Sequence, residues 1–175
     1  MTPATIFNIQ MALGYVAWLL CFAAYGWPRL RAMEPADAIR AIAVLHAFRF
    51  FGLGFAFPGL VEPGVPSAFA QPAAMGDLAA SLLAIFALLA FRSRPLFWLF
   101  AMAFNVVGAS DLILNSVHAV HLSLPEMSGR LGVMYAVPVI YVPILMITHV
   151  VAFALMVRGL LGQRVDHQVA VSSPV

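Results

Sequence analysis

The sequence is poor in charge. Only 9% of its 175 residues are Asp, Glu, Lys or Arg, whereas 63% are apolar, and the mean hydropathy is +0.98. Soluble domains are about half apolar and about a quarter charged. A water-soluble fold of this length could not hide so much apolar surface, because its surface is too large relative to its volume. We therefore expect lipid to be the solvent for most of the chain.

Other absences exclude whole classes of function. Lysine is missing, since all nine basic residues are arginine, so the chain cannot form the Schiff base of a retinal pigment. The single cysteine, Cys21, allows no disulfide within the chain. There is also no glycine-rich phosphate loop, no G-x-S-x-G motif and no soluble basic patch. We therefore expect no nucleotide, no acyl transfer and no nucleic-acid partner.

Five long apolar segments are present, and a helix needs roughly 20 such residues to cross a bilayer. They are residues 6–26, 39–60, 74–91, 95–118 and 131–157. Prolines gather in the connections, where proline ends one helix or opens the next. The sequence predicts an all-α polytopic transmembrane bundle of five helices, forming one domain over residues 1–164. The short polar stretch 165–175 is predicted to be a disordered tail.

Arginines are distributed unevenly between the two sides of this bundle. The connections on one side, with the end of the fifth segment, hold Arg29, Arg31, Arg40, Arg92, Arg94, Arg158 and Arg164. The opposite side holds only Arg130. Cytoplasmic loops carry the excess of basic residues, so the arginine-rich side is predicted to be cytoplasmic. This places the N-terminus outside and the C-terminus inside, in a protein expected in a bacterial cytoplasmic (inner) membrane.

Polar side chains lie inside these apolar segments, although a charge at the centre of a membrane helix costs roughly 2.5–3.5 kcal/mol. The strongest pattern is in the fourth segment, where positions three or four apart share one helical face: Asn105, Gly108, Asp111, Asn115 and His118. Other segments add His46, Arg49, Asp77 and His149. Ionisable residues at this depth pair with one another or line a cavity.

Counting about 1.5 Å per residue along a helix predicts two layers of polar side chains. The middle-to-inner layer contains His46, Arg49, Asn105 and His149. The outer layer contains Asp77, Asp111, Asn115, His118 and Tyr135. We expect Arg49 to pair with Asp111 or, as second choice, with Asp77. The competing interpretation is that such residues serve only as hydrogen-bonding links between helices.

Three kinds of chemistry fit parts of this pattern. His46 and His149 are expected at similar depth on different helices, where two imidazoles could bind a b-type haem from both faces. Asp77, Asp111 and His118 could ligate a hydrolytic metal ion, although no H-E-x-x-H motif is present. Buried Asp and His could also relay protons in a small proton-coupled transporter.

One stretch resembles a known family. It runs Arg49-Phe-Phe-Gly52-Leu-Gly54-Phe-Ala-Phe-Pro-Gly59 and continues through a proline-rich loop to Gly76-Asp77. Over about residues 46–91 this is similar to the DoxX-like small membrane proteins. Two features depart from the family pattern: Val61-Glu62 replaces a basic residue, and Asp77 replaces a glutamate. The resemblance implies a four-helix membrane protein, with quinone or thiol redox chemistry in some members.

The leading hypothesis is a protein that binds a membrane-soluble small molecule, such as a quinone, isoprenoid or lipid, between the second, fourth and fifth segments. Arg49 would anchor an anionic group, and Asp111 would be its partner and a possible proton acceptor. The pocket wall would include His46, Asp77, Asn105, Asn115, His118 and His149. The alternative is an accessory or structural subunit of a larger membrane complex or homo-oligomer. The sequence predicts no particular cofactor.

Overall fold

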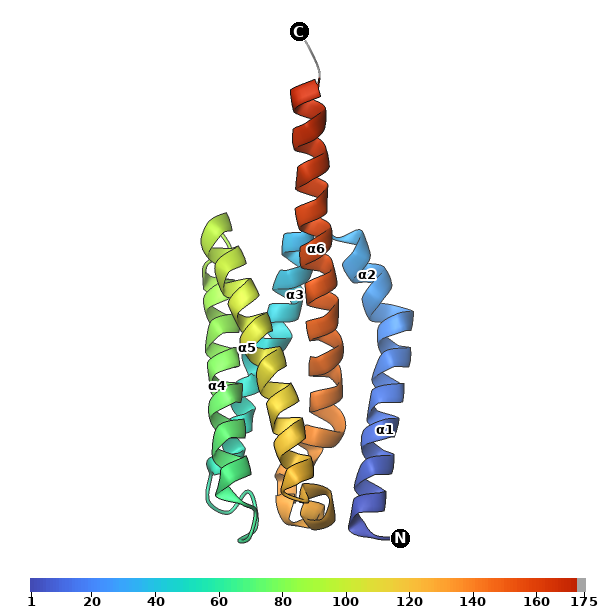
Figure 1. Cartoon of the computed structure of the whole chain (residues 1–175), viewed down its shortest axis with the longest axis vertical. Coiled ribbons are helices and arrows are strands. Elements are labelled where there is room, and N and C mark those ends of the chain that lie inside the picture. The colour runs from blue at the N-terminus through green and yellow to red at the C-terminus, as the bar shows by residue number, and fades with distance from the viewer. Residues whose placement is uncertain (173–175) are drawn as a thin grey trace.

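The computed structural model describes the backbone of residues 1–172 and the side-chain surroundings of residues 1–159. Over this part every regular element is helical, and five helical segments are long and apolar enough to cross a membrane. Figure 1 shows these segments side by side in one bundle, with the N-terminus at its lower end. The predicted all-α, five-helix architecture is confirmed.

The first crossing, Pro3–Ala32, comprises α1 (Pro3–Cys21), a π-helical turn η1 (Phe22–Gly26) and α2 (Trp27–Ala32). The second, Pro35–Ala56, is α3 (Pro35–Ala47) continued by the 3-10 helix η2 (Phe48–Ala56). The third and fourth are α4 (Ser67–Leu89) and α5 (Arg94–His121). A 3-10 segment, η3 (Leu124–Tyr135), then leads into the π-helical turn η4 (Val137–Tyr141) and α6 (Val142–Ser172), and the fifth crossing is Val137–Gly159.

Several segment boundaries differ from the prediction. The third helix begins at Ser67 instead of residue 74, because Pro72 near its start removes one intrahelical hydrogen bond without ending the helix. The fifth crossing begins at Val137 instead of residue 131, because Gly132 breaks the backbone with φ of +55°. The predicted tail, 165–175, overlaps α6, which continues through Ser172 since no proline occurs between Pro143, at its start, and Pro174. Residues 173–175 lie outside the described residues.

The interior contains two apolar clusters separated by a polar layer. The first cluster lies toward the arginine-rich end and includes Ile39, Ile42, Phe97, Phe104 and Leu155. The second lies toward the other end and includes Phe55, Phe69, Leu124, Leu131 and Met134. Between them come the buried polar residues His46, Arg49, Asp77, Asn105 and His149. The four inner crossings each pass from one cluster through the polar layer to the other, so the layer lies near mid-depth.

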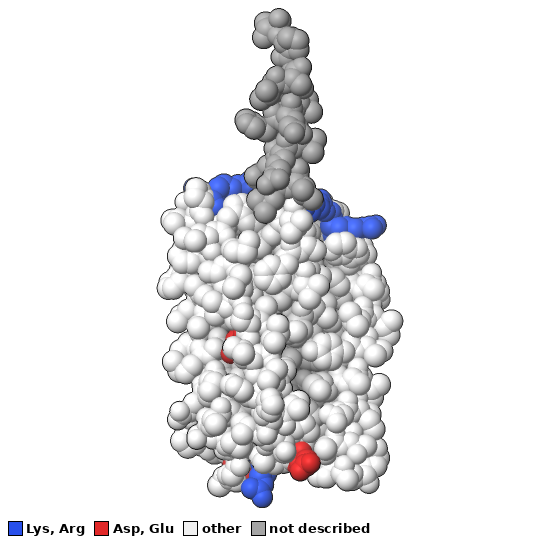
Figure 2. Space-filling model, viewed as in Figure 1, with Lys and Arg blue, Asp and Glu red and all other residues white. Residues whose placement is uncertain are grey.

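The outer surface of the bundle is apolar over most of its length. Exposed side chains on this surface include Leu13, Leu20, Phe86, Leu99, Ile113 and Val150. Figure 2 shows basic residues gathered at the upper end, a few charges at the lower end, and between them a long face that is uncharged except for a small acidic patch at mid-height. Such a belt is what a membrane-spanning protein presents to lipid, because no polar solvent reaches it.

The first crossing packs on one side of the bundle, against η3, η4 and α6. Phe7 is the only buried residue of α1. The indole Nε1 of Trp18 donates a hydrogen bond of 2.8 Å to the carbonyl oxygen of Ile140, in the π-helical turn η4. Near the N-terminal end, the Tyr135 hydroxyl donates to the side-chain oxygen of Gln10. At the opposite end, Arg158 Nη1 donates to the carbonyl oxygen of Arg31 at 2.8 Å. The first crossing is therefore a peripheral helix held at three polar points.

Candidate functional site

Arg49 is the centre of the polar layer. Its side chain is fully buried, and its Nε donates to Asp77 Oδ1 at 2.8 Å while its Nη2 donates to Asp111 Oδ2 at 2.7 Å. The guanidinium thus joins η2 to α4 and α5. The expected pairing with Asp111 is present, and so is the second-choice pairing with Asp77. A buried guanidinium needs such partners, because an unpaired charge in lipid is costly.

Asp77 lies deeper than predicted. A helix starting at residue 74 would have put Asp77 in an outer layer, apart from Arg49. Because α4 begins at Ser67, Asp77 lies near the middle of this helix and reaches the guanidinium. Asp77 and Asp111, which were predicted in the outer layer, therefore lie in the same layer as Arg49.

His149 extends the network on the far side of Arg49. Its Nε2 lies 3.2 Å from Arg49 Nη1, and its Nδ1 lies 3.0 Å from Asn105 Oδ1. Since the Asn105 amide nitrogen donates to the carbonyl of Ala101 at 2.9 Å, its oxygen must be the acceptor for His149. This arrangement assigns the proton of a neutral imidazole to Nδ1 and leaves Nε2 to accept from Arg49.

His46 lies beside His149 but belongs to a separate set of bonds. Its Nε2 is 3.0 Å from the Thr148 hydroxyl, which itself donates to the carbonyl of Ile144 at 2.8 Å. The hydroxyl has one proton, so His46 donates to it through Nε2–H. The other ring nitrogen, Nδ1, is then an acceptor, and it is buried without a partner among the described residues.

Three glycines make room for the charged groups. A Cβ at Gly52 would overlap the Asp77 carboxylate, and a Cβ at Gly76 would overlap the Asp111 carboxylate. A Cβ at Gly108 would lie 2.5 Å from Arg49 Nη1 and 2.7 Å from the His149 ring. No other residue type leaves the backbone this close to a side-chain charge. The spacing of these glycines is thus part of the ion-pair cluster.

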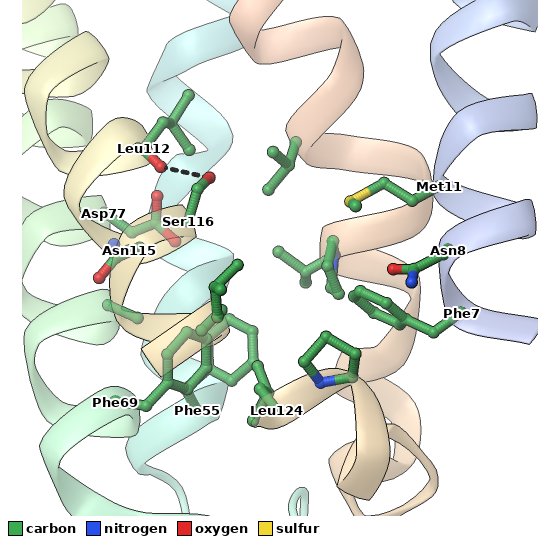
Figure 3. Close-up of a pocket in the computed structure, with 17 residues that line it drawn as sticks. Phe7, Asn8, Met11, Phe55, Phe69, Asp77, Leu112, Asn115, Ser116 and Leu124 are labelled. Carbon is green, nitrogen blue, oxygen red and sulfur yellow. Dashed lines mark hydrogen bonds between the residues drawn. The ribbon is translucent and has the colours of Figure 1, made fainter. Parts of the chain in front are cut away.

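A cavity of about 180 Å³ lies next to the cluster, toward the N-terminal end of α1. Figure 3 shows α1 on one side of it, with Asn8 and Met11 facing the space, and Asp77 and Leu112 on the opposite side. Its walls are mainly apolar, and its polar residues are Asn8, Asp77, Asn115 and Ser116. Ser116 already donates to the carbonyl of Leu112 at 2.7 Å.

The structure brings together most, but not all, of the predicted site residues. Arg49, Asp77, Asn105, Asp111 and His149 form one network, to which Asn115 is joined by a 2.8 Å bond to Asp111. His46 packs against His149 without a hydrogen bond between them. His118 is exposed, because it lies near the end of α5 and turns away from the bundle.

The predicted pocket position also needs correction. The space between the second, fourth and fifth crossings is filled by the Arg49 side chain itself. The cavity lies instead between α1, α4, α5 and the η3–η4 region, and Arg49 does not line it. The sequence pattern could not reveal this site, because most of its wall residues are ordinary apolar residues.

The geometry does not fit a haem ligated by His46 and His149. Their ring centroids are 4.2 Å apart, so the two rings pack directly against each other. A haem bound from both faces needs the macrocycle between the two imidazoles, and no space is left there. The predicted metal site is not assembled either. Asp77 and Asp111 both bind Arg49, His118 is exposed, and the described residues contain no group of three potential ligands.

Comparison with family models gives one match, over residues 6–157, to a family described as a domain of unknown function (DUF8737). This chain belongs to the DUF8737 family. The matched region of this DUF8737 protein covers the three middle crossings, nearly all of the first and fifth, and every residue of the Arg49 cluster. No curated protein and no solved structure matches the chain. The resemblance to DoxX-like proteins stays a prediction.

Proposed function

We propose that this multi-pass membrane protein binds a membrane-soluble small molecule in the cavity between α1, α4, α5 and η3. The observation that supports the proposal is the cavity itself. Apolar interiors are normally packed without voids larger than a water molecule, and a dry cavity of roughly 150 Å³ can hold a benzene ring. A space of about 180 Å³ therefore suits a ring or a short branched chain.

The surroundings of the cavity favour a ligand that arrives from the bilayer. Ser116 and Val120 of α5 and Asn8 of α1 line the cavity and are themselves exposed on the outside of the bundle. The opening of the cavity toward lipid thus lies between the first crossing and α5. Hydrophobic molecules dissolved in lipid reach such a lateral opening without passing through water.

The uneven distribution of arginines supports the orientation proposed for the bundle. With the arginine-rich end in the cytoplasm, the cavity lies in the outer half of the membrane. The first apolar cluster then closes the cytoplasmic side of the polar layer with Phe97, Phe104 and Leu155, all fully or almost fully buried. This arrangement favours a binding protein over a channel, because the described conformation has no polar path through the cytoplasmic half.

Photolabelling tests the proposal. The purified protein in phosphatidylcholine nanodiscs is exposed to a small apolar diazirine, and the labelled positions are mapped by mass spectrometry. We expect labels to concentrate in residues 112–125 and to be displaced by excess unlabelled analogue. Ala119→Phe fills the cavity wall and should remove the saturable label, whereas Ala17→Phe on the exposed side of α1 should not. Label spread evenly over the lipid-facing surface would refute the proposal.

A further inference from the structure

The polar end of the cavity is formed by one carboxylate oxygen. Asp77 is 7% exposed and lines the cavity. Its Oδ1 accepts from Arg49, whereas no described residue donates to its Oδ2. This oxygen lies against Gly52, where a Cβ would overlap it. It is not among the fully buried atoms that lack a partner, so it keeps accessible surface, and the cavity that Asp77 lines is the space beside it. A carboxylate oxygen in an apolar space requires a donor, because leaving it unpaired costs free energy.

The donors near this oxygen are directed elsewhere. The Asn115 amide turns toward α4 and donates to Asp111, and the Ser116 hydroxyl donates to its own helix backbone (Figure 3). Arg49 is fully buried behind the wall. On the opposite wall, Asn8 can donate or accept and so does not discriminate between ligands. The site thus supplies an acceptor at its deep end, and the lining residue that could supply a donor, Asn8, lies on the opposite wall.

The net charge of the cluster also favours a hydrogen-bond donor over an anion as the ligand's polar group. With both carboxylates ionised, Arg49, Asp77 and Asp111 carry a net charge of −1. His149 accepts from Arg49 through Nε2 and so is a neutral imidazole, and a further cation at the fully buried His46 beside it would be unfavourable, so neither residue offsets this charge. An anionic ligand would add to the excess, whereas a cationic one would cancel it. Asp77 is the member of the cluster at which a ligand in the cavity can do so.

We infer that the cavity selects ligands whose polar group is a hydrogen-bond donor, either an ammonium group or a hydroxyl, over ligands that present a carbonyl or an anion. The donor would bind Asp77 Oδ2, and the apolar body would occupy the space lined by Phe55, Phe69 and Val137. This inference rests on the proposed function and makes it more specific. It also reverses the expectation that Arg49 anchors an anionic group.

A matched series of probes tests the selectivity. Phenethylamine, 2-phenylethanol, phenylacetone and phenylacetate share one ring and a short tether and differ in the polar group. Each competes against the apolar photolabel in neutral nanodiscs, and Ala119→Phe defines the signal that does not come from the cavity. We expect the amine and the alcohol to compete at concentrations at least about tenfold lower than the ketone and the carboxylate, since a charge-assisted hydrogen bond is made only by the donors.

Asp77→Asn supplies a second, independent readout. An asparagine can keep its oxygen on Arg49 and turn its NH₂ group into the cavity, which removes the charge and replaces the acceptor by a donor. The preference should then shift from the amine toward the ketone by about tenfold or more. Glu62→Gln removes a carboxylate in an exposed loop outside the cavity and should leave the preference unchanged.

The outcomes separate the two proposals. If no probe competes and no saturable label forms, the proposed function itself fails. If the ketone or the carboxylate competes as well as the amine in the unaltered protein, the cavity binds ligands but the inferred selectivity is wrong. An amine preference that persists in Asp77→Asn would also overturn the assignment to Asp77. If that variant does not fold, the probe series with the unaltered protein decides alone.

Discussion

Arg49 Nη2 and Asp111 Oδ2 lie 2.7 Å apart and join η2 to α5 in the middle of the bundle. Asp111 also accepts a bond of 2.8 Å from Asn115 Nδ2, which holds its second oxygen. The pair is therefore fixed on both sides. Buried ion pairs of this kind add little net stability, but removing one partner leaves the other charge without compensation.

Replacing Asp111 should for this reason destabilise the protein strongly. We expect Asp111→Ala to lower the free energy of unfolding by about 3–5 kcal/mol, because Arg49 keeps its buried charge and loses one of its two carboxylates. Asp111→Asn should cost less, since an amide oxygen still accepts from Arg49. Unfolding in mixed micelles measures the free energy of unfolding of both variants.

The control is Glu126→Ala, which removes an exposed carboxylate in η3 and should change the free energy of unfolding by less than about 0.5 kcal/mol. Equal effects of Asp111→Ala and Glu126→Ala would contradict a paired Arg49.

The close approach at Gly76 leads to a second prediction. Alanine is favoured over glycine in a helix by about 1 kcal/mol, so a Gly→Ala change inside α4 would ordinarily be stabilising. At Gly76 the added methyl group overlaps the Asp111 carboxylate, and neither group can move without breaking the bond to Arg49. We expect Gly76→Ala to destabilise by about 1–3 kcal/mol.

Gly129→Ala is the matched control for this change. A Cβ at Gly129 meets nothing within 4 Å, so the same substitution should be close to neutral. Thermal unfolding of both variants in one detergent gives the comparison. If Gly76→Ala is as stable as Gly129→Ala, the packing of Gly76 against Asp111 is not as the structure has it.

Much of this architecture could be predicted from the sequence. Hydropathy alone gave five crossings, because the bilayer imposes one length and one polarity on every helix. The pairing of Arg49 with Asp111 followed from the cost of a lone charge in lipid. By contrast, the predicted depth of Asp77 was wrong. The prediction started the third helix after Pro72, whereas Pro72 lies inside α4, because a proline near a helix start ends the helix only in some contexts.

The cavity and the His46–His149 contact could not be predicted in the same way. Whether two histidines at equal depth face each other across a cofactor or pack ring against ring depends on the rotation of their helices, which sequence spacing does not fix. The cavity lies between the first crossing, α5 and the η3–η4 region. Its apolar residues, such as Met11 and Ala119, resemble lipid-facing ones in every sequence property.

The orientation of the bundle leads to a third prediction. In a Cys21→Ser background, Glu62→Cys places a thiol in the loop between η2 and α4, and Ser93→Cys places one in the turn between α4 and α5. Both positions are exposed. With the arginine-rich end in the cytoplasm, a membrane-impermeant maleimide should label Glu62→Cys in intact cells and Ser93→Cys only after lysis. The reverse pattern would invert the proposed orientation and place the cavity in the cytoplasmic half.

The attachment of the first crossing leads to the last prediction. Trp18 donates to the Ile140 carbonyl, and this bond holds α1 against η4 beside the close packing of Gly14 on Val139. Trp18→Phe keeps an aromatic ring and removes the donor, which should cost about 0.5–1.5 kcal/mol in the docking of α1. Hydrogen exchange in residues 3–32 should accelerate, while exchange in α4 stays the same. Trp27→Phe makes the same chemical change at an exposed indole without a described hydrogen bond, and it should leave exchange unaltered.

Because α1 forms one wall of the cavity through Phe7, Asn8 and Met11, Trp18→Phe should also weaken the saturable photolabel. Faster exchange in α1 with unchanged labelling would show that the first crossing does not contribute to the binding site.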